Sequence, residues 1–133
     1  MRNALSWVAM TIVALFATGC NRGGGDRCSV DGAVTMAGQP VDGGNIQFAP
    51  LAAGQVSASG AVIEAGKYAI PRQSGLVPGK YRVRIYWPVK VGTQQAPNNP
   101  PPKERVPAKF NVSSELTAEV WPGSENTFNF ALQ

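Results

Sequence analysis

The chain has 133 residues, a formal net charge of +4 and no histidine. Histidine is the commonest general base and metal ligand, and the acidic residues are spread singly, without metal-ligand spacing. The basic residues are also scattered, unlike the footprint of a nucleic-acid-binding protein. We therefore expect no catalytic residues, no cofactor, no metal site and no nucleic-acid partner.

Residues 1–19 are typical of an export signal. One arginine precedes a mostly apolar run over residues 4–17, and small residues follow at the cleavage position. The run falls short of the roughly 20 apolar residues that a membrane-spanning helix needs. The next cysteine completes a segment that resembles the lipobox of bacterial lipoproteins, with alanine where leucine is commonest: Leu15-Phe16-Ala17-Thr18-Gly19-Cys20.

This resemblance implies cleavage before Cys20, a diacylglyceryl group on its thiol, and acylation of the new N-terminus. The protein would then be exported and anchored to a membrane of the bacterial cell envelope, on the periplasmic or the outer face. Two or three acyl chains hold a protein on a membrane much more firmly than one. Two alternatives remain open: an ordinary signal peptide with an incidental cysteine, and an uncleaved membrane span.

Residues 20–28 form the expected tether between membrane and domain. They include three consecutive glycines flanked by polar and charged residues, a composition typical of a short flexible linker. A lipid on Cys20 leaves Cys28 without an intramolecular partner. Cys28 is then a small residue at the start of the first strand or the site of an intermolecular disulfide. Without the lipid, the two cysteines can pair with each other.

From residue 29 to residue 133 the sequence predicts one domain of short strands separated by Gly, Pro and Asn. The clearest strand covers 80–87, where apolar and basic residues alternate with period two. Segment 55–63 is expected as a weak, partly exposed strand anchored by Val56 and Val62. Gly38 and Gly79 are expected to shape the turns around them. The predicted strands are 29–36, 45–49, 55–63, 68–70, 80–87, 116–120 and 127–132.

A long proline-rich loop is expected over residues 88–107. Its polyproline-like centre at 100–102 favours a stiff spacer, with a ligand for a proline-recognising partner as the alternative.

About seven short strands with regular turns predict an all-β fold, in the form of a two-sheet antiparallel β-sandwich. Each strand would direct one face into the core. The expected inward side chains are Val34, Ile46, Phe48, Tyr68, Ile70, Tyr81, Val83, Ile85, Leu116, Val120, Phe128, Phe130 and Leu132.

The domain also resembles a family in three segments that follow one another in order. They are Val30-Asp31-Gly32-Ala33-Val34 through Gly38-Gln39-Pro40-Val41, the pair Gly66-Lys67-Tyr68-Ala69-Ile70 and Pro78-Gly79-Lys80-Tyr81-Arg82-Val83, and the tail from Val106 to Phe130. The pattern is similar to that of carboxypeptidase-regulatory-like modules of small bacterial lipoproteins. The resemblance implies a seven-stranded, transthyretin-like Greek-key sandwich. The hydrolases known on this fold depend on histidines, so their activity is not expected here.

Two surface features could carry binding. One strand carries a basic stripe on its outer face, made of Lys80, Arg82 and Arg84. This stripe is either solvated and paired across to Glu119, or it docks to an anionic envelope polymer or an acidic partner. Trp87 shares the alternation phase of the inward residues and is expected to cap the core. Trp121 falls on the outward phase and is the better candidate for contact with a sugar or a partner.

Together these features predict a lipid-anchored, non-catalytic β-sandwich module with a binding or structural role at the cell envelope. A carbohydrate-binding module of the envelope is the alternative. The partner of the first would be an envelope protein or a polysaccharide, contacted through an exposed strand edge or the proline-rich loop.

Overall fold

The structure is a computed structural model that describes residues 26–55, 57–89 and 101–133. The predicted signal segment, Cys20, Val56 and residues 90–100 of the proline-rich loop lie outside the described residues. The strands are β1 Val30–Met36, β2 Gln39–Pro40, β3 Gly44–Pro50, β4 Ser59–Ile63, β5 Lys67–Ile70, β6 Gly79–Tyr86, β7 Thr117–Val120, β8 Asn126–Thr127 and β9 Phe130–Leu132. Two 3₁₀ turns also occur: η1 Arg72–Ser74 and η2 Ala108–Phe110.

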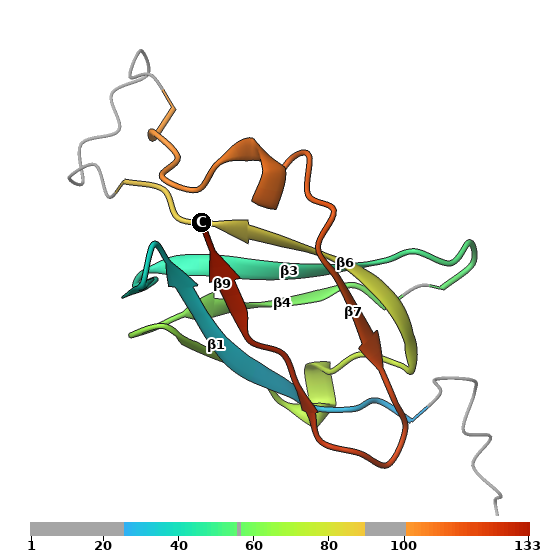
Figure 1. Ribbon diagram of the computed structural model, residues 1–133. Helices are drawn as coiled ribbons and strands as arrows, with labels where there is room; N and C mark the ends of the chain where they lie inside the picture. The colour runs from blue at the N-terminus through green and yellow to red at the C-terminus, as the bar shows by residue number, and fades with distance from the viewer. Residues whose placement is uncertain (1–25, 56, 90–100) are drawn as a thin grey trace, which may run out of the picture.

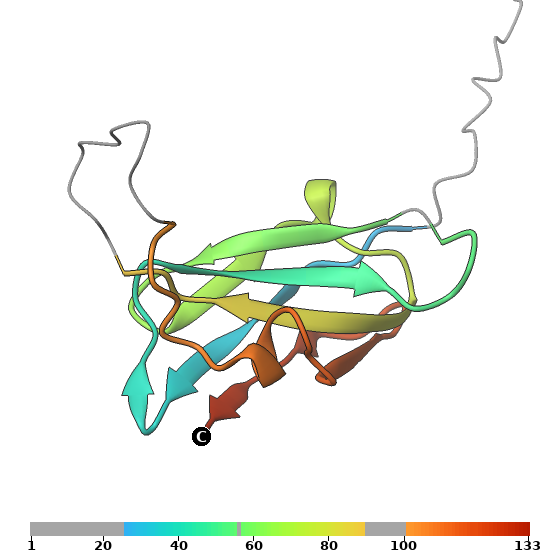
Figure 2. The same ribbon diagram turned by 90° about the horizontal axis from the view of Figure 1, so that it is seen from above.

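The strands form two sheets packed face to face, which confirms the all-β sandwich (Figures 1 and 2). One sheet has the order β4-β3-β6-β7, with every neighbouring pair antiparallel. In the other sheet β1 is central. It pairs with β2 and β5 on one side and with β8 and β9 on the other.

The last strands differ from the expected antiparallel pairing. Both β8 and β9 run parallel to β1, with Val30 opposite Asn126 and Met36 opposite Leu132. They run this way because loop 121–125 carries the chain from the end of β7 to the start of β1, and the chain then follows β1 along its length (Figure 1).

The predicted strand 127–132 is interrupted at Phe128 and Asn129. The Asn129 side-chain oxygen, rather than a backbone carbonyl, accepts the Ala33 N–H at 2.9 Å. The Phe128 carbonyl lies so close to Gly32 that a Cβ there would overlap it. A strand ladder is made of hydrogen bonds between backbone groups, so the side-chain bond of Asn129 and the close approach to Gly32 separate β8 from β9.

The core contains the residues expected to face inward. Most are almost fully buried, whereas Leu116, Phe128 and Phe130 pack against the core but keep partial exposure. The alternation of strand side chains is therefore a sound guide here. The core also includes Val41, Leu76 and Val106, which lie outside the strands, where no periodicity indicates which side chain turns inward.

The expected anchor of β4 is wrong by one residue. Val62 is 61% exposed, whereas its neighbour Ile63 is fully buried. The register explains the difference, because Ala61 lies opposite the core residue Ile46 and therefore shares its inward face with Ile63. Both adjacent residues are apolar, so hydrophobicity alone does not fix the phase of this strand.

The two expected turn glycines have unusual backbone angles. Gly38 has φ of 78° between β1 and β2, and Gly79 has φ of 150° at the start of β6. Next to this turn, the fully buried Tyr81 accepts a hydrogen bond from Gln55 at 2.7 Å and donates one to the Val77 carbonyl at 2.7 Å. The pair of bonds ties two loops to the core.

The proline-rich loop begins and ends as a paired stem. Val89 N–H donates to the Lys103 carbonyl at 2.8 Å, and Pro88 forms a bridge with Glu104. The Glu104 carboxylate also accepts the N–H groups of Trp87, at 2.7 Å, and Val106, at 3.0 Å. The described part of the loop is therefore fixed to the end of β6.

Candidate functional site

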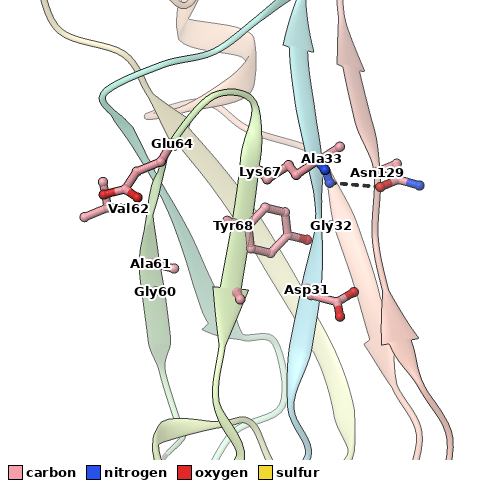
Figure 3. Close-up of a pocket in the computed structure, with 11 residues that line it drawn as sticks. Asp31, Gly32, Ala33, Gly60, Ala61, Val62, Glu64, Lys67, Tyr68 and Asn129 are labelled. Atoms are coloured by element: carbon pink, nitrogen blue, oxygen red, sulfur yellow. Dashed lines mark hydrogen bonds between the residues drawn. The ribbon is translucent and has the colours of Figure 1, made fainter.

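An open hollow of about 830 Å³ lies beside the neighbouring strands β4, β5 and β1 (Figure 3). Its wall is made largely of small residues, among them Gly60, Ala61 and Ala69. Small side chains on the edge strand β4 and on β5 leave room above the backbone. The hollow is thus a product of composition at the strand edges.

Polar side chains surround this wall. Asp31, Glu64, Lys67 and Asn129 all line the hollow. Thr127 donates its hydroxyl to the Asp31 carboxylate at 2.7 Å, which fixes that side chain from β8. Carboxylates accept and ammonium groups donate hydrogen bonds, so the hollow suits a polar ligand rich in hydroxyl groups.

Tyr68 lies on the inner side of the hollow. Its hydroxyl donates to the Phe128 carbonyl at 2.8 Å. Burial raises the pKa of Tyr68 well above its ordinary value of 10.0, and the nearby Asp31 carboxylate adds to this shift. Tyr68 therefore stays protonated at neutral pH and serves as a hydrogen-bond donor rather than as a base. Among the described residues, no cluster of three acidic or cysteine side chains is suited to holding a metal ion.

The basic stripe lies on the outer face of β6, as expected. Lys80 lies directly opposite Glu119, and Arg82 opposite Thr117. Arg82 is exposed and Arg84 is half-buried. The Nε of Arg84 and the side-chain oxygen of Asn45 are buried without a partner in the described part of the chain.

Trp87 and Trp121 have the different environments that their phases predict. Trp87 packs against the core and donates its indole N–H to the Asp42 carbonyl at 2.8 Å. The Arg105 guanidinium lies 4.9 Å from the centre of its rings. Trp121 is 57% exposed just after β7.

The backbone of Trp121 is held in place although its side chain is free of the core. Its N–H donates to the Asn126 side-chain oxygen at 2.9 Å, and the Asn126 amide donates back to the Trp121 carbonyl at 3.1 Å. The thiol of the half-buried Cys28 lies 3.6 Å from the same carbonyl. Trp121 is thus next to the point where the described chain begins.

The predicted site residues do not form one site. Trp121 lies four residues beyond Thr117, the partner of Arg82, which corresponds to about 13 Å along a strand. Arg84 is two residues farther away along β6. Cys20 lies outside the described residues.

The hollow beside β4 and β5 was missed by sequence reasoning. Its polar residues come from β1, the turn after β4, the start of β5 and the segment before β9, and their spacing in the chain carries no signal. The pairing of β1 with β5 on one side and with β9 on the other brings these side chains together. The run Gly60-Ala61 was the one available hint, since small residues on a strand leave space beside it.

Across the described residues, no helix combines the length and the apolar character needed to cross a membrane. Comparison of the chain with protein-family models, curated proteins and solved structures found no match.

Proposed function

We propose that the protein is an exported, lipid-anchored module of the bacterial cell envelope, with a non-catalytic binding or structural role. The observation that carries the proposal is the segment 15–20, in which Cys20 follows two small residues after a short apolar run. A β-sandwich directly after a Gly-rich stretch fits a domain held close to a membrane. The absence of histidine from the sequence supports a non-catalytic role.

The transthyretin-like identity of the sandwich belongs to the same proposal. It is supported by the three sequence segments that resemble carboxypeptidase-regulatory-like modules. The partner in this proposal is an envelope protein or polysaccharide.

The test is the intact mass of the protein isolated from the membrane fraction. We expect a chain that begins at Cys20 and carries acyl groups, because the thiol is the lipid attachment site. The Cys20→Ser protein is expected to lack the added mass and to be absent from the membrane fraction. Cys28→Ser is the matched control. It is expected to keep the acyl mass and the membrane association, since the Cys28 thiol lies within the domain. An unmodified chain unaffected by Cys20→Ser would overturn the anchor.

A carbohydrate-binding module is a second candidate, favoured by the open hollow beside β4 and β5. Carboxylates and an ammonium group around a wall of glycine and alanine can hydrogen-bond sugar hydroxyls without steric obstruction.

Affinity electrophoresis in gels containing soluble envelope polysaccharide tests this candidate. We expect the protein to be retarded, and Asp31→Ala to lose most of the retardation because it removes an acceptor in the hollow. Glu115→Ala changes an exposed carboxylate away from the hollow and serves as the control. This candidate would be contradicted if polysaccharide in the gel retarded neither the unsubstituted protein nor its Asp31→Ala and Glu115→Ala variants.

A further inference from the structure

The described chain begins at the end of the sandwich that carries Trp121. Cys28 exchanges two backbone hydrogen bonds with Leu76, at 2.8 and 3.1 Å, and its thiol contacts the Trp121 carbonyl. Arg27 donates to the Gly75 carbonyl at 2.7 Å. The C-terminus lies at the opposite end of the domain (Figure 1). The N-terminal connection is therefore fixed beside one particular end of the sandwich.

The distance from this end to Cys20 is bounded by covalent geometry. Five residues lie between Cys20 and Asp26, the first described residue, so six Cα-to-Cα steps join them. Even a fully extended chain spans at most about 3.6 Å per step, or about 22 Å in total. If Cys20 carries the lipid of the proposed function, this end of the domain stays within about 22 Å of the membrane surface.

Two exposed apolar side chains lie at the same end. Trp121 is 57% exposed after β7, and Leu51 is 43% exposed after β3. Both strands flank the start of β6: Leu51 N–H donates to the Lys80 carbonyl at 3.0 Å, and Lys80 lies opposite Glu119. Two strand spacings therefore separate Leu51 from β7, which is about 10 Å.

The side chains suit a membrane interface. An indole combines a large apolar surface with one polar N–H, and tryptophan is enriched at the headgroup level of membranes for this reason. The hollow beside Trp121 is lined by charges of both signs, Arg27 and Arg72 with Asp26 and Glu125. Because these charges balance, contact with lipid would depend on the apolar side chains more than on anionic headgroups.

We infer that the domain rests on the membrane that holds its own anchor, with Trp121 inserted at headgroup level and Leu51 beside it. This inference rests on the lipid anchor of the proposed function. The two hydrogen bonds between Asn126 and the Trp121 backbone hold that backbone in place, so its ordering costs little conformational entropy on contact.

The test uses the full lipidated chain in phosphatidylcholine vesicles, with bromine atoms high on the acyl chains as contact quenchers. The Trp121 emission is the difference between the protein and its Trp121→Phe variant. We expect brominated lipid to remove more than half of this emission. The matched control is Trp121→Phe combined with Val112→Trp. Val112 is 70% exposed and lies near Tyr86, at the far end of β6. The tryptophan introduced there is therefore expected to stay away from the membrane and to keep its emission in brominated lipid.

Flotation of the vesicles distinguishes the lipid anchor from the docking of the domain on the membrane. Co-flotation with quenched Trp121 emission supports the docked domain. Co-flotation with an emission that responds to aqueous iodide but not to brominated lipid overturns it, leaves the anchor intact, and frees Trp121 for a protein or sugar partner. A full chain that fails to float overturns the anchor and the docking together.

Discussion

Two tyrosines of the core each combine a buried ring with a satisfied hydroxyl. Tyr81 bonds to Gln55, Ser57 and Val77, and Tyr68 bonds to the Phe128 carbonyl. A buried hydroxyl without a partner would be costly. The bonds to Gln55, Ser57 and Phe128 also link the core to distant segments of the chain. The alternation of residues predicted both rings as inward, but it could not predict the partners, because these lie in loops and in the interruption between β8 and β9.

Tyr68 gives the domain a dependence on alkaline pH. Burial raises the pKa of Tyr68 in the folded state above its ordinary 10.0, so the fold favours the neutral phenol. This stability is fully present below pH 10 and is lost as the pH rises above the unfolded pKa. We expect Tyr68→Phe to be less stable at neutral pH by about 1 kcal/mol through the lost hydrogen bond, yet to lose less stability on alkalinisation.

Urea unfolding at neutral pH and near pH 11 measures both effects. Tyr86→Phe is the control, since Tyr86 is half-buried at the end of β6. If the free energy of unfolding falls equally between neutral pH and pH 11 in the unsubstituted protein and in Tyr68→Phe, another group controls alkaline unfolding.

At the level of elements, two hairpin turns use the same pair of residues. Ala37-Gly38 and Ala65-Gly66 all have positive φ, from 49° to 78°. Two successive positive φ values match the primed turns that suit twisted hairpins, where asparagine followed by glycine is the usual pair. The second turn is held by the Asp42 carboxylate, which accepts the Ala65 N–H at 2.9 Å.

Ala65 is expected to be a site of stored strain. The left-handed region costs an ordinary residue about 1 kcal/mol, and asparagine tolerates it better. We expect Ala65→Asn to stabilise the fold by about 0.5 kcal/mol or more, measured as a higher midpoint of thermal unfolding. Gly66→Ala is the opposing control, because its Cβ would collide with Pro40. A lower midpoint for Ala65→Asn would show that the strain estimate is wrong.

At the level of the whole molecule, sequence reasoning succeeded where a local pattern decides the structure. Alternation placed Val83 and Ile85 inward and Trp121 outward, and a single glycine marked the turn at Gly38. It failed where a distant partner decides. The phase of Val62 depends on the register with β3, and the break at Asn129 depends on the close approach to Gly32.

The polar lining of the hollow depends on the direction of the last strands. Asp31 and Asn129 reach one surface only because β9 runs along β1, and no spacing in the sequence encodes that approach. The contact between the Cys28 thiol and the Trp121 carbonyl likewise forms because the loop from β7 to β8 passes the start of β1. Surfaces made from both ends of the chain are therefore visible only after folding.

The parallel pairing of β1 with β8 and β9 also sets when the domain can fold. One whole flank of β1 is completed by residues 126–132, which are made about 90 residues after it. Contacts across such a separation are slow to form, and they cannot form before both partners exist. Until residues 126–132 are available, β1 keeps one edge of unpaired backbone N–H and C=O groups, so the sandwich is completed only by this late-made segment.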